Sequence, residues 1–535
     1  MKFDPLYNPY PSSRQVVYAS NGMVATSQPL AAQVGLDVLK RGGNAIDAAV
    51  ATAAALTVLE PTSNGIGGDA FALIWTNGKL YGLNSSGFSP AKISIEAVKA
   101  RGHEKMPVVG WESITVPGVP AAWAELTKKF GKMPMVETLK GAIDYADKGY
   151  PISPILSTLW QNAFNYFKRS MKDEMFNNWA KVFAHEGRAP RVGEIWRSPD
   201  HVKTLQEIAE TNGESFYRGK IAELIAQASA KDNGFLTADD LASFVPDWVE
   251  PIKVNYRGYD VWEIPPNGQG LVALMALNIL NGLELIDRDS PATLHKQIEA
   301  IKLAFADGQH YITDPRKMKV AVEDLLSEAY AAERRKLITD YARKPEIGEP
   351  YGGGTVYLAT ADGEGNMVSF IQSNYRGFGS GVVIPGTGIA LQNRGETFSL
   401  DPTEVNCLEP RKRTYHTIIP GFLTRDNEPV GPFGVMGGFM QPQGHVQVIC
   451  NTIDFNLNPQ AALDAPRWQW IKDKAVEIEN TMSPTISSAL ARKGHVISIP
   501  VSRNSFGHGQ IIWRDKSGVL VGGSESRTDG TVVGY

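Results

Sequence analysis

Cysteine is scarce in this chain, whose 535 residues contain only Cys407 and Cys450. Two cysteines exclude a disulfide-stabilised scaffold and a four-cysteine metal site. Two free thiols suit a reducing compartment. The start of the chain, residues 1–7, lacks the charged and apolar regions of a secretory signal. We therefore expect a cytoplasmic protein.

Long apolar runs and a strong net charge are also lacking. The longest apolar stretch, Ala48 to Leu59, is interrupted by threonines and too short to cross a bilayer, so we interpret it as a buried helix. The formal net charge is −4, which gives no basic field for nucleic acid or anionic lipid. We expect neither nucleic acid nor membrane as a partner, whereas a homo-oligomer is compatible with the sequence. The hydrophobic fraction of 43% is enough for a large core.

Several well-known site motifs are missing. The chain contains no GxSxG elbow, no HExxH and no GxxxxGK[ST], and its nine histidines show no metal-ligand spacing. The glycine-rich run Gly377–Gly381 lies between strand patterns and does not open a helix, as a nucleotide site would require. We therefore predict no metal and no cofactor.

Helices and strands are both indicated. The spacing of apolar residues predicts two helices between Pro29 and Leu59, separated at 42–44. A hairpin is predicted over 71–83, with its turn at 76–78. Residues 121–303 read as mainly helical, with short strands at 254–256 and 261–264. After position 355 strands dominate, at 356–361 and 367–373, with more strands near Ile384, Ile389, Ile418, Val435, Ile511 and Val519.

The change of character falls at Thr355. Residues 342–354 contain Lys-Pro, Glu-Pro and three consecutive glycines, which is the composition of an exposed linker. If the Gly354–Thr355 bond is cut, Thr355 gains a free α-amine with a pKa of about 8 beside its hydroxyl, so one residue supplies both nucleophile and base. From these residues alone, the favoured interpretation is that Thr355 is the first residue of an ordinary strand.

The rest of the chain resembles the γ-glutamyltranspeptidase family of N-terminal-nucleophile hydrolases, over nearly its full length. The motifs that carry this resemblance are 22–26, 39–49, 65–69, 116–118, 304–307, the threonine strand, 392–395, 412–413, 437–438 and 526–530. The resemblance implies a four-layer αββα sandwich (α/β, or α+β). It also implies self-cleavage into a large, helix-rich chain of residues 1–354 and a small, strand-rich chain of 355–535, which build one joint domain.

Catalytic roles follow from the same resemblance. Thr355 matches the family's nucleophile, and Ser373 matches a hydroxyl residue that orients it, although an ordinary strand serine fits as well. Gly437 and Gly438 match the glycine pair whose backbone N–H groups stabilise the oxyanion, and glycine lets a backbone approach a reacting carbonyl closely. A tight turn is the alternative interpretation of this pair. The implied reaction is acyl transfer through an acyl-threonine to water or an amine.

The family's anchors for a γ-glutamyl group are mostly absent. Ser86 stands where an arginine is expected, and Thr397, with Glu396 beside it, stands in place of an acidic residue. His416 and Thr417 replace a serine pair, while Asn393 looks retained. His416 is suited to bind a carboxylate or carbonyl, although a lone histidine is often a core residue.

Two arginines offer new anchors for an acidic substrate. Arg376 and Arg394 lie in the loops after the second strand, where solvent-exposed arginines are also common. These features resemble a branch of the family that includes oxamate amidohydrolase and glutaryl-type cephalosporin acylases. We expect a small-molecule amide, acidic in character, as substrate. The resemblance implies an activity like that of a glutathione hydrolase or γ-glutamyltransferase, or alternatively that of an amidohydrolase acting on oxamate or glutaryl amides. A non-catalytic binding relative is the remaining alternative.

Overall fold

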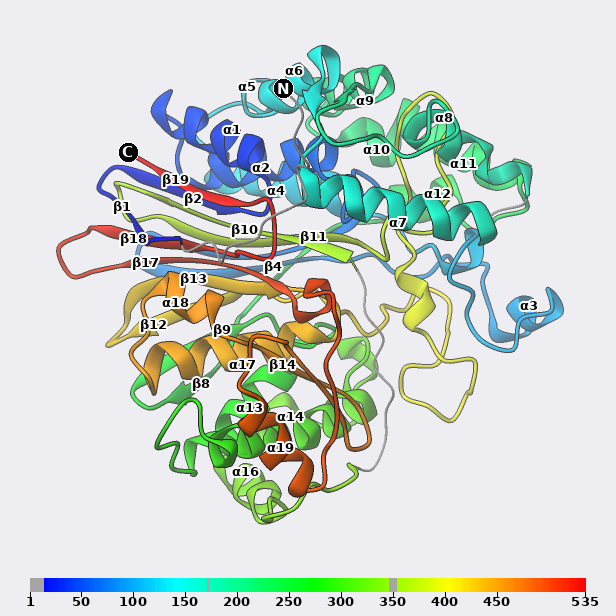
Figure 1. The fold of residues 1–535 in the computed structure, drawn as a ribbon. Coiled ribbons are helices and arrows are strands. Elements are labelled where there is room, and N and C mark those ends of the chain that lie inside the picture. The colour runs from blue at the N-terminus through cyan, green and yellow to red at the C-terminus, as the bar shows by residue number, and fades with distance from the viewer. Residues whose placement is uncertain (1–13, 171–172, 346–353) are drawn as a thin grey trace.

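Two seven-stranded antiparallel sheets stack face to face, and helices cover the outer face of each (Figure 1). The computed structural model describes residues 14–170, 173–345 and 354–535. The expected four-layer αββα sandwich of the N-terminal-nucleophile hydrolase fold is therefore confirmed. Most of the predicted linker at 342–354 lies outside the described residues.

The first sheet contains the strand that begins beside Thr355. Its order is β19-β2-β10-β11-β3-β4-β7. The bounds are β19 (Thr531–Gly534), β2 (Gly22–Thr26), β10 (Gly354–Asp362), β11 (Met367–Tyr375), β3 (Asp69–Thr76), β4 (Lys79–Ser85) and β7 (Asp247–Val249). The hairpin β3–β4 turns at Asn77 and Gly78, both with positive φ, as the sequence predicted.

The second sheet has the order β1-β18-β17-β13-β12-β9-β8. Its strands are β1 (Val17–Ala19), β18 (Leu520–Ser524), β17 (His508–Arg514), β13 (Glu428–Met436), β12 (Gly421–Arg425), β9 (Tyr259–Glu263) and β8 (Ile252–Tyr256). Both sheets combine strands from before and after position 355. The two stretches of chain that cleavage would separate therefore share one fold.

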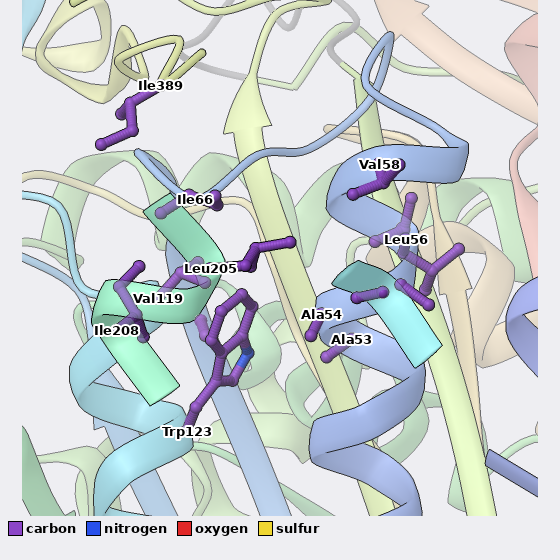
Figure 2. Packing of buried hydrophobic residues seen from close by; sticks show 14 of the residues in the cluster. Ala53, Ala54, Leu56, Val58, Ile66, Val119, Trp123, Leu205, Ile208 and Ile389 are labelled. Carbon is purple, nitrogen blue, oxygen red and sulfur yellow. The ribbon is translucent and has the colours of Figure 1, made fainter. Parts of the chain in front are cut away.

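One helix layer covers the first sheet through α1 (Pro29–Lys40), α2 (Ala45–Leu59) and α4 (Val119–Phe130), behind which lie α6 (Lys140–Lys148) and α9 (Pro199–Glu210). Asn44 separates the first two helices because its side chain accepts from the N–H groups of Ile46 and Asp47 and so caps α2. Every residue of α2 is buried. Figure 2 shows this core around Trp123, whose indole N–H donates to Gln372 of β11 at 3.3 Å.

The other helix layer covers the second sheet through α13 (Gly270–Asn281), α17 (Met440–Ile453) and α18 (Pro459–Asp464), with α14 (Pro291–Tyr311) packed on α13. A third core fills the space between the sheets, where β10 and β11 face β13. This packing brings the start of β10 and the end of β13 to the same end of the sandwich, because the ring of Tyr357 lies under Gly434.

The remaining elements surround this frame. The peripheral helices are α3 (Ile95–Ala100), α5 (Met135–Thr138), α7 (Pro154–Ser170), α8 (Asn177–Phe183), α10 (Glu214–Arg218), α11 (Lys220–Lys231), α12 (Ala238–Ala242), α15 (Val322–Leu325), α16 (Glu328–Arg335) and α19 (Pro484–Arg492). The small sheets are β5 (Tyr150–Pro151) with β6 (Ile195–Trp196), and β14 (Trp468–Lys472) with β15 (Ala475–Ile478) and β16 (Val496–Ser498). No helix within the described ranges has the length and apolar character to cross a membrane.

The strands predicted near Ile384 and Ile389 do not form. This segment is a loop in which a single bridge joins Val383 to Ala390. Both isoleucines are fully buried against the first helix layer and its sheet. Burial in a loop, and not strand pairing, explains their apolar pattern.

Candidate active site

Thr355 is a buried residue at the beginning of β10, 1% exposed. Its hydroxyl donates to the Oγ of Ser373 on the neighbouring strand β11 at 3.1 Å, and the backbone N–H of Tyr375 donates to the same Oγ at 2.8 Å. The structure thus brings together the two hydroxyl residues that the sequence singled out. Strand β10 begins at Gly354, so the Gly354–Thr355 peptide bond, at which cleavage is predicted, lies at its first residue pair.

A β-bulge lies at this point of the β10–β11 pair. Gly354 pairs with Tyr375 and Val356 pairs with Gln372, so two residues of β11 oppose Thr355 alone. Tyr375 has a φ of 71°, in the left-handed region that few large side chains adopt. Bulges of this kind re-aim side chains, and here Thr355 and Ser373 meet across the irregular step.

Arg394 lies beside this bulge. Its guanidinium carbon is 4.2 Å from the centre of the Tyr375 ring, and its Nη1 donates to Thr417 Oγ1 at 2.7 Å. The side chain is 1% exposed. Burial lowers the pKa of Arg394 to about 10, while Tyr375 and the carboxylates of Asp69 and Glu396 raise it, so the group remains charged at neutral pH.

Gln269 connects this cluster to the glycine pair. Its Nε2 donates to the backbone oxygens of Thr417 at 2.6 Å and Gly438 at 2.8 Å. The Gly437 carbonyl accepts from Met440 at the start of α17. Because a trans peptide points its N–H opposite to its carbonyl, the Gly438 N–H points away from that helix. Such an outward N–H is the donor that an oxyanion requires.

His416 pairs with a carboxyl group of the protein itself. Its Nδ1 accepts from the Ile418 N–H at 3.3 Å, which leaves the proton on Nε2, and Nε2 donates to Asp69 Oδ2 at 3.0 Å. Burial, together with Arg394 and Arg413, lowers the pKa of His416 well below its ordinary value. Burial also raises the pKa of Asp69 to about 7, although Arg394 opposes this shift. The pair is a hydrogen bond of neutral histidine, not an ion pair.

Asp69 should make stability depend on pH. A carboxyl group whose pKa is raised on folding, here from 3.8 to about 7, contributes stability that is complete below the unfolded value and lost as pH rises through the folded value. Relative to Asp69→Asn, the wild type should therefore lose about 2 kcal/mol between pH values of about 5.5 and 8.5. Urea unfolding at both pH values measures this loss. Asp426→Asn, at an exposed turn, is the control, and a difference between wild type and Asp69→Asn that does not change with pH would contradict the expectation.

The remaining predicted substrate residues are held by protein partners. Arg376 Nη2 forms an ion pair with Glu396 at 2.6 Å. The Asn393 side-chain NH2 group donates to the backbone oxygen of Val108, and its Oδ1 accepts from the backbone N–H of Arg376. Thr397 donates to backbone oxygens, and its hydroxyl lies 2.8 Å from that of Thr414. Ser86 hydrogen-bonds with Asn84 and Asn267. Ser86 and Asn393 therefore use their polar groups on other residues of the protein.

A cavity of about 780 Å³ opens beside these residues. Tyr375, Arg376, Glu396 and Thr397 line it, together with Phe439, the residue after the glycine pair. Thr355 and Arg394 are not among its lining residues, whereas Tyr375, on whose ring Arg394 stacks, is one of them. The volume is typical of a site for a drug-sized ligand.

Three residues of this site received no role from the sequence. Asp69 closes the quoted motif 65–69, Tyr375 lies in the loop that was quoted for its arginine, and Gln269 follows the predicted turn at 265–268. Asp69 lies 347 positions from its partner His416, which no local pattern reveals. The one available signal for Asp69 in the sequence was an acidic residue at the start of an apolar strand.

The fold is that of the N-terminal-nucleophile hydrolases. A model of the family described as gamma-glutamyltranspeptidase matches residues 31–535. The chain belongs to this family, and its relatives in the family are hydrolase and acylase proenzymes.

Individual relatives match this chain over nearly their full length. The chain is 35% identical over 531 residues to the glutathione hydrolase-like YwrD proenzyme of Bacillus subtilis, covering 97% of this chain and 99% of that one. It is 33% identical over 530 residues to the oxamate amidohydrolase proenzyme of Klebsiella pneumoniae, with coverages of 97% and 99%. The crystal structure of a cephalosporin acylase from Bacillus halodurans superimposes with a TM-score of 0.98, at 62% identity over 100% of this chain and 99% of that one.

Proposed function

We propose that this protein is a self-processing amidohydrolase whose nucleophile is Thr355 after cleavage of the Gly354–Thr355 bond. The observation that carries the proposal is the Thr355 hydroxyl, held by Ser373 at the start of β10 in a chain whose relatives are proenzymes. A threonine at a new amino terminus carries its own base in its α-amine.

Processing and turnover use the same hydroxyl. In processing, Thr355 Oγ1 attacks the Gly354 carbonyl carbon, the C–N bond breaks, the Thr355 nitrogen takes the proton, and water hydrolyses the resulting ester. In turnover, the α-amine takes the hydroxyl proton while Oγ1 bonds to the substrate carbonyl carbon. The leaving amine receives that proton, and water or a second amine resolves the acyl-threonine. In both processing and turnover, the Gly437 and Gly438 N–H groups donate hydrogen bonds to the oxyanion.

The acyl group we favour is acidic and larger than oxalyl. Arg394, buried against the Tyr375 ring, supplies positive charge, and the neighbouring cavity of about 780 Å³ is large for an oxamate-sized molecule. The first listed structural relative is named a cephalosporin acylase. A glutaryl-type amide therefore ranks first, and γ-glutamyl donors and oxamate are the alternatives.

The free thiols of Cys407 and Cys450 suit the cytoplasmic location expected from the sequence.

Incubation of the purified chain tests this function directly. We expect two bands, with Thr355 as the amino terminus of the smaller chain, and hydrolysis of glutaryl-p-nitroanilide with a burst of p-nitroaniline. Glutathione, γ-glutamyl-p-nitroanilide and oxamate are assayed beside it. A chain that stays intact and hydrolyses none of them would identify a non-catalytic relative, and activity confined to γ-glutamyl donors would reject the glutaryl preference.

A further inference from the structure

The guanidinium of Arg394 has one satisfied corner and one free edge. Nη1 is occupied by Thr417 Oγ1, whereas Nε and Nη2, both buried, have no hydrogen-bond partner in the part of the chain that the structure describes. Nε–H and the neighbouring N–H of Nη2 point in the same direction from the planar group. They form the two-donor edge that binds both oxygens of one carboxylate.

The positive charge of Arg394 also lacks a counterion in contact. Among the described residues no carboxylate forms an ion pair with it, and Asp69 and Glu396 act on it only at longer range. Asp69 is hydrogen-bonded to His416, and Glu396 is paired with Arg376. A buried charge with two open donors is costly to leave unpaired, which favours an anion at that edge when the site is filled.

Arg394 and Thr355 are both neighbours of Tyr375. Tyr375 pairs with Gly354, the residue before Thr355, at the β10–β11 bulge, and Arg394 stacks on the Tyr375 ring at 4.2 Å. The anchor and the nucleophile are thus linked through this tyrosine, which favours an acyl group with some length between its carbonyl and its carboxylate. A glutaryl group has about 5 Å between these two carbons when extended, whereas in an oxalyl group they are adjacent.

We propose that Arg394 is the anchor for a carboxylate at the far end of the acyl group, and that Thr417 positions it. The substrate class is thus amides of dicarboxylic acids with several carbons between the two carboxyl carbons. This inference rests on the proposed function of Thr355. It assigns the specificity to Arg394, and not to Arg376, because the charge of Arg376 is already neutralised by Glu396 at 2.6 Å.

A pair of matched substrates tests the anchor. Glutaryl-p-nitroanilide is compared with its uncharged analogue, in which a carboxamide replaces the terminal carboxylate. For the wild type we expect kcat/KM to be on the order of 100-fold higher for the charged substrate, because the buried donors stay unpaired with the analogue. In Arg394→Gln this ratio should fall to about one, and in Arg394→Lys it should be intermediate, since lysine keeps the charge without the fork.

Three further variants separate the anchor from other effects. Arg376→Gln should keep the ratio even if it changes absolute rates, and Arg425→Gln is a surface control whose guanidinium also lies over a tyrosine ring. Processing of each variant is followed on a gel. If Arg394→Gln is not cleaved, Thr417→Val is used, for which we expect KM to rise for the charged substrate alone.

The outcomes are distinct. A wild type that hydrolyses both substrates equally well, or an Arg394→Gln enzyme that keeps the 100-fold ratio, overturns the anchor and leaves the Thr355 nucleophile in place. A ratio lost in Arg376→Gln but kept in Arg394→Gln moves the assignment to Arg376. A wild type that is not cleaved and hydrolyses neither amide overturns the proposed function, and the anchor with it.

Discussion

Replacing Thr355 by alanine is expected to leave one chain of 58.3 kDa that is never cleaved and has no amidase activity. The alanine has no hydroxyl to attack the Gly354 carbonyl, so no new amino terminus forms and neither nucleophile nor base is created. We expect kcat to fall by a factor on the order of 10⁴ or more, as when a nucleophile is removed from other covalent hydrolases. Intact mass and amidase rate measure the two losses.

Two other threonine variants make this result specific. Thr355→Ser keeps a hydroxyl and should still be cleaved, with residual activity. Thr360→Val alters a buried threonine further along the same strand, whose hydroxyl donates to Ala45 at 2.7 Å, and should be processed like the wild type. Cleavage of Thr355→Ala at the wild-type position would show that another group performs the attack.

The sequence predicted the frame of this fold where the determinants are local. Asn44 is a helix cap whose acceptor geometry is encoded within three residues, and Asn77-Gly78 is a turn that fixes its own hairpin. The break before α2 and the hairpin turn were both predicted correctly, and the capping role of Asn44 is seen in the structure. Ile384 and Ile389 show the limit, because an apolar residue buried in a loop leaves the same pattern as one in a strand.

The site was less predictable because it is assembled from distant segments. The positions of Thr355 and Ser373 followed from a family resemblance, and their 3.1 Å contact arises at a bulge that no composition signals. The resemblance treated His416 as a residue for substrate, and the structure places it on Asp69, 347 residues away. Arg376 and Arg394 look alike in sequence, and only their partners, Glu396 for one and Thr417 for the other, distinguish them.

Gly437→Ala should slow the chemical step while leaving substrate binding nearly unchanged. Gly437 has a φ of 141°, and an added Cβ would lie 3.1 Å from the Cα of Gly507, so the turn must shift to accept alanine. That shift moves the Gly437 and Gly438 N–H groups away from the developing oxyanion. Since oxyanion donors act mainly in the transition state, we expect kcat to fall about 10²- to 10³-fold with a small change in KM.

Gly386→Ala is the matched control for backbone strain. Gly386 has a φ of 72°, and its added Cβ meets nothing within 4 Å, so alanine there costs conformational energy without touching the site. Both variants should lose about 1–2 kcal/mol of unfolding free energy from the left-handed backbone, but only Gly437→Ala should lose turnover. Urea unfolding and steady-state kinetics on the same samples measure both effects. Equal kcat values in the two variants would remove the glycine pair from the oxyanion role, because strain alone would then account for every change.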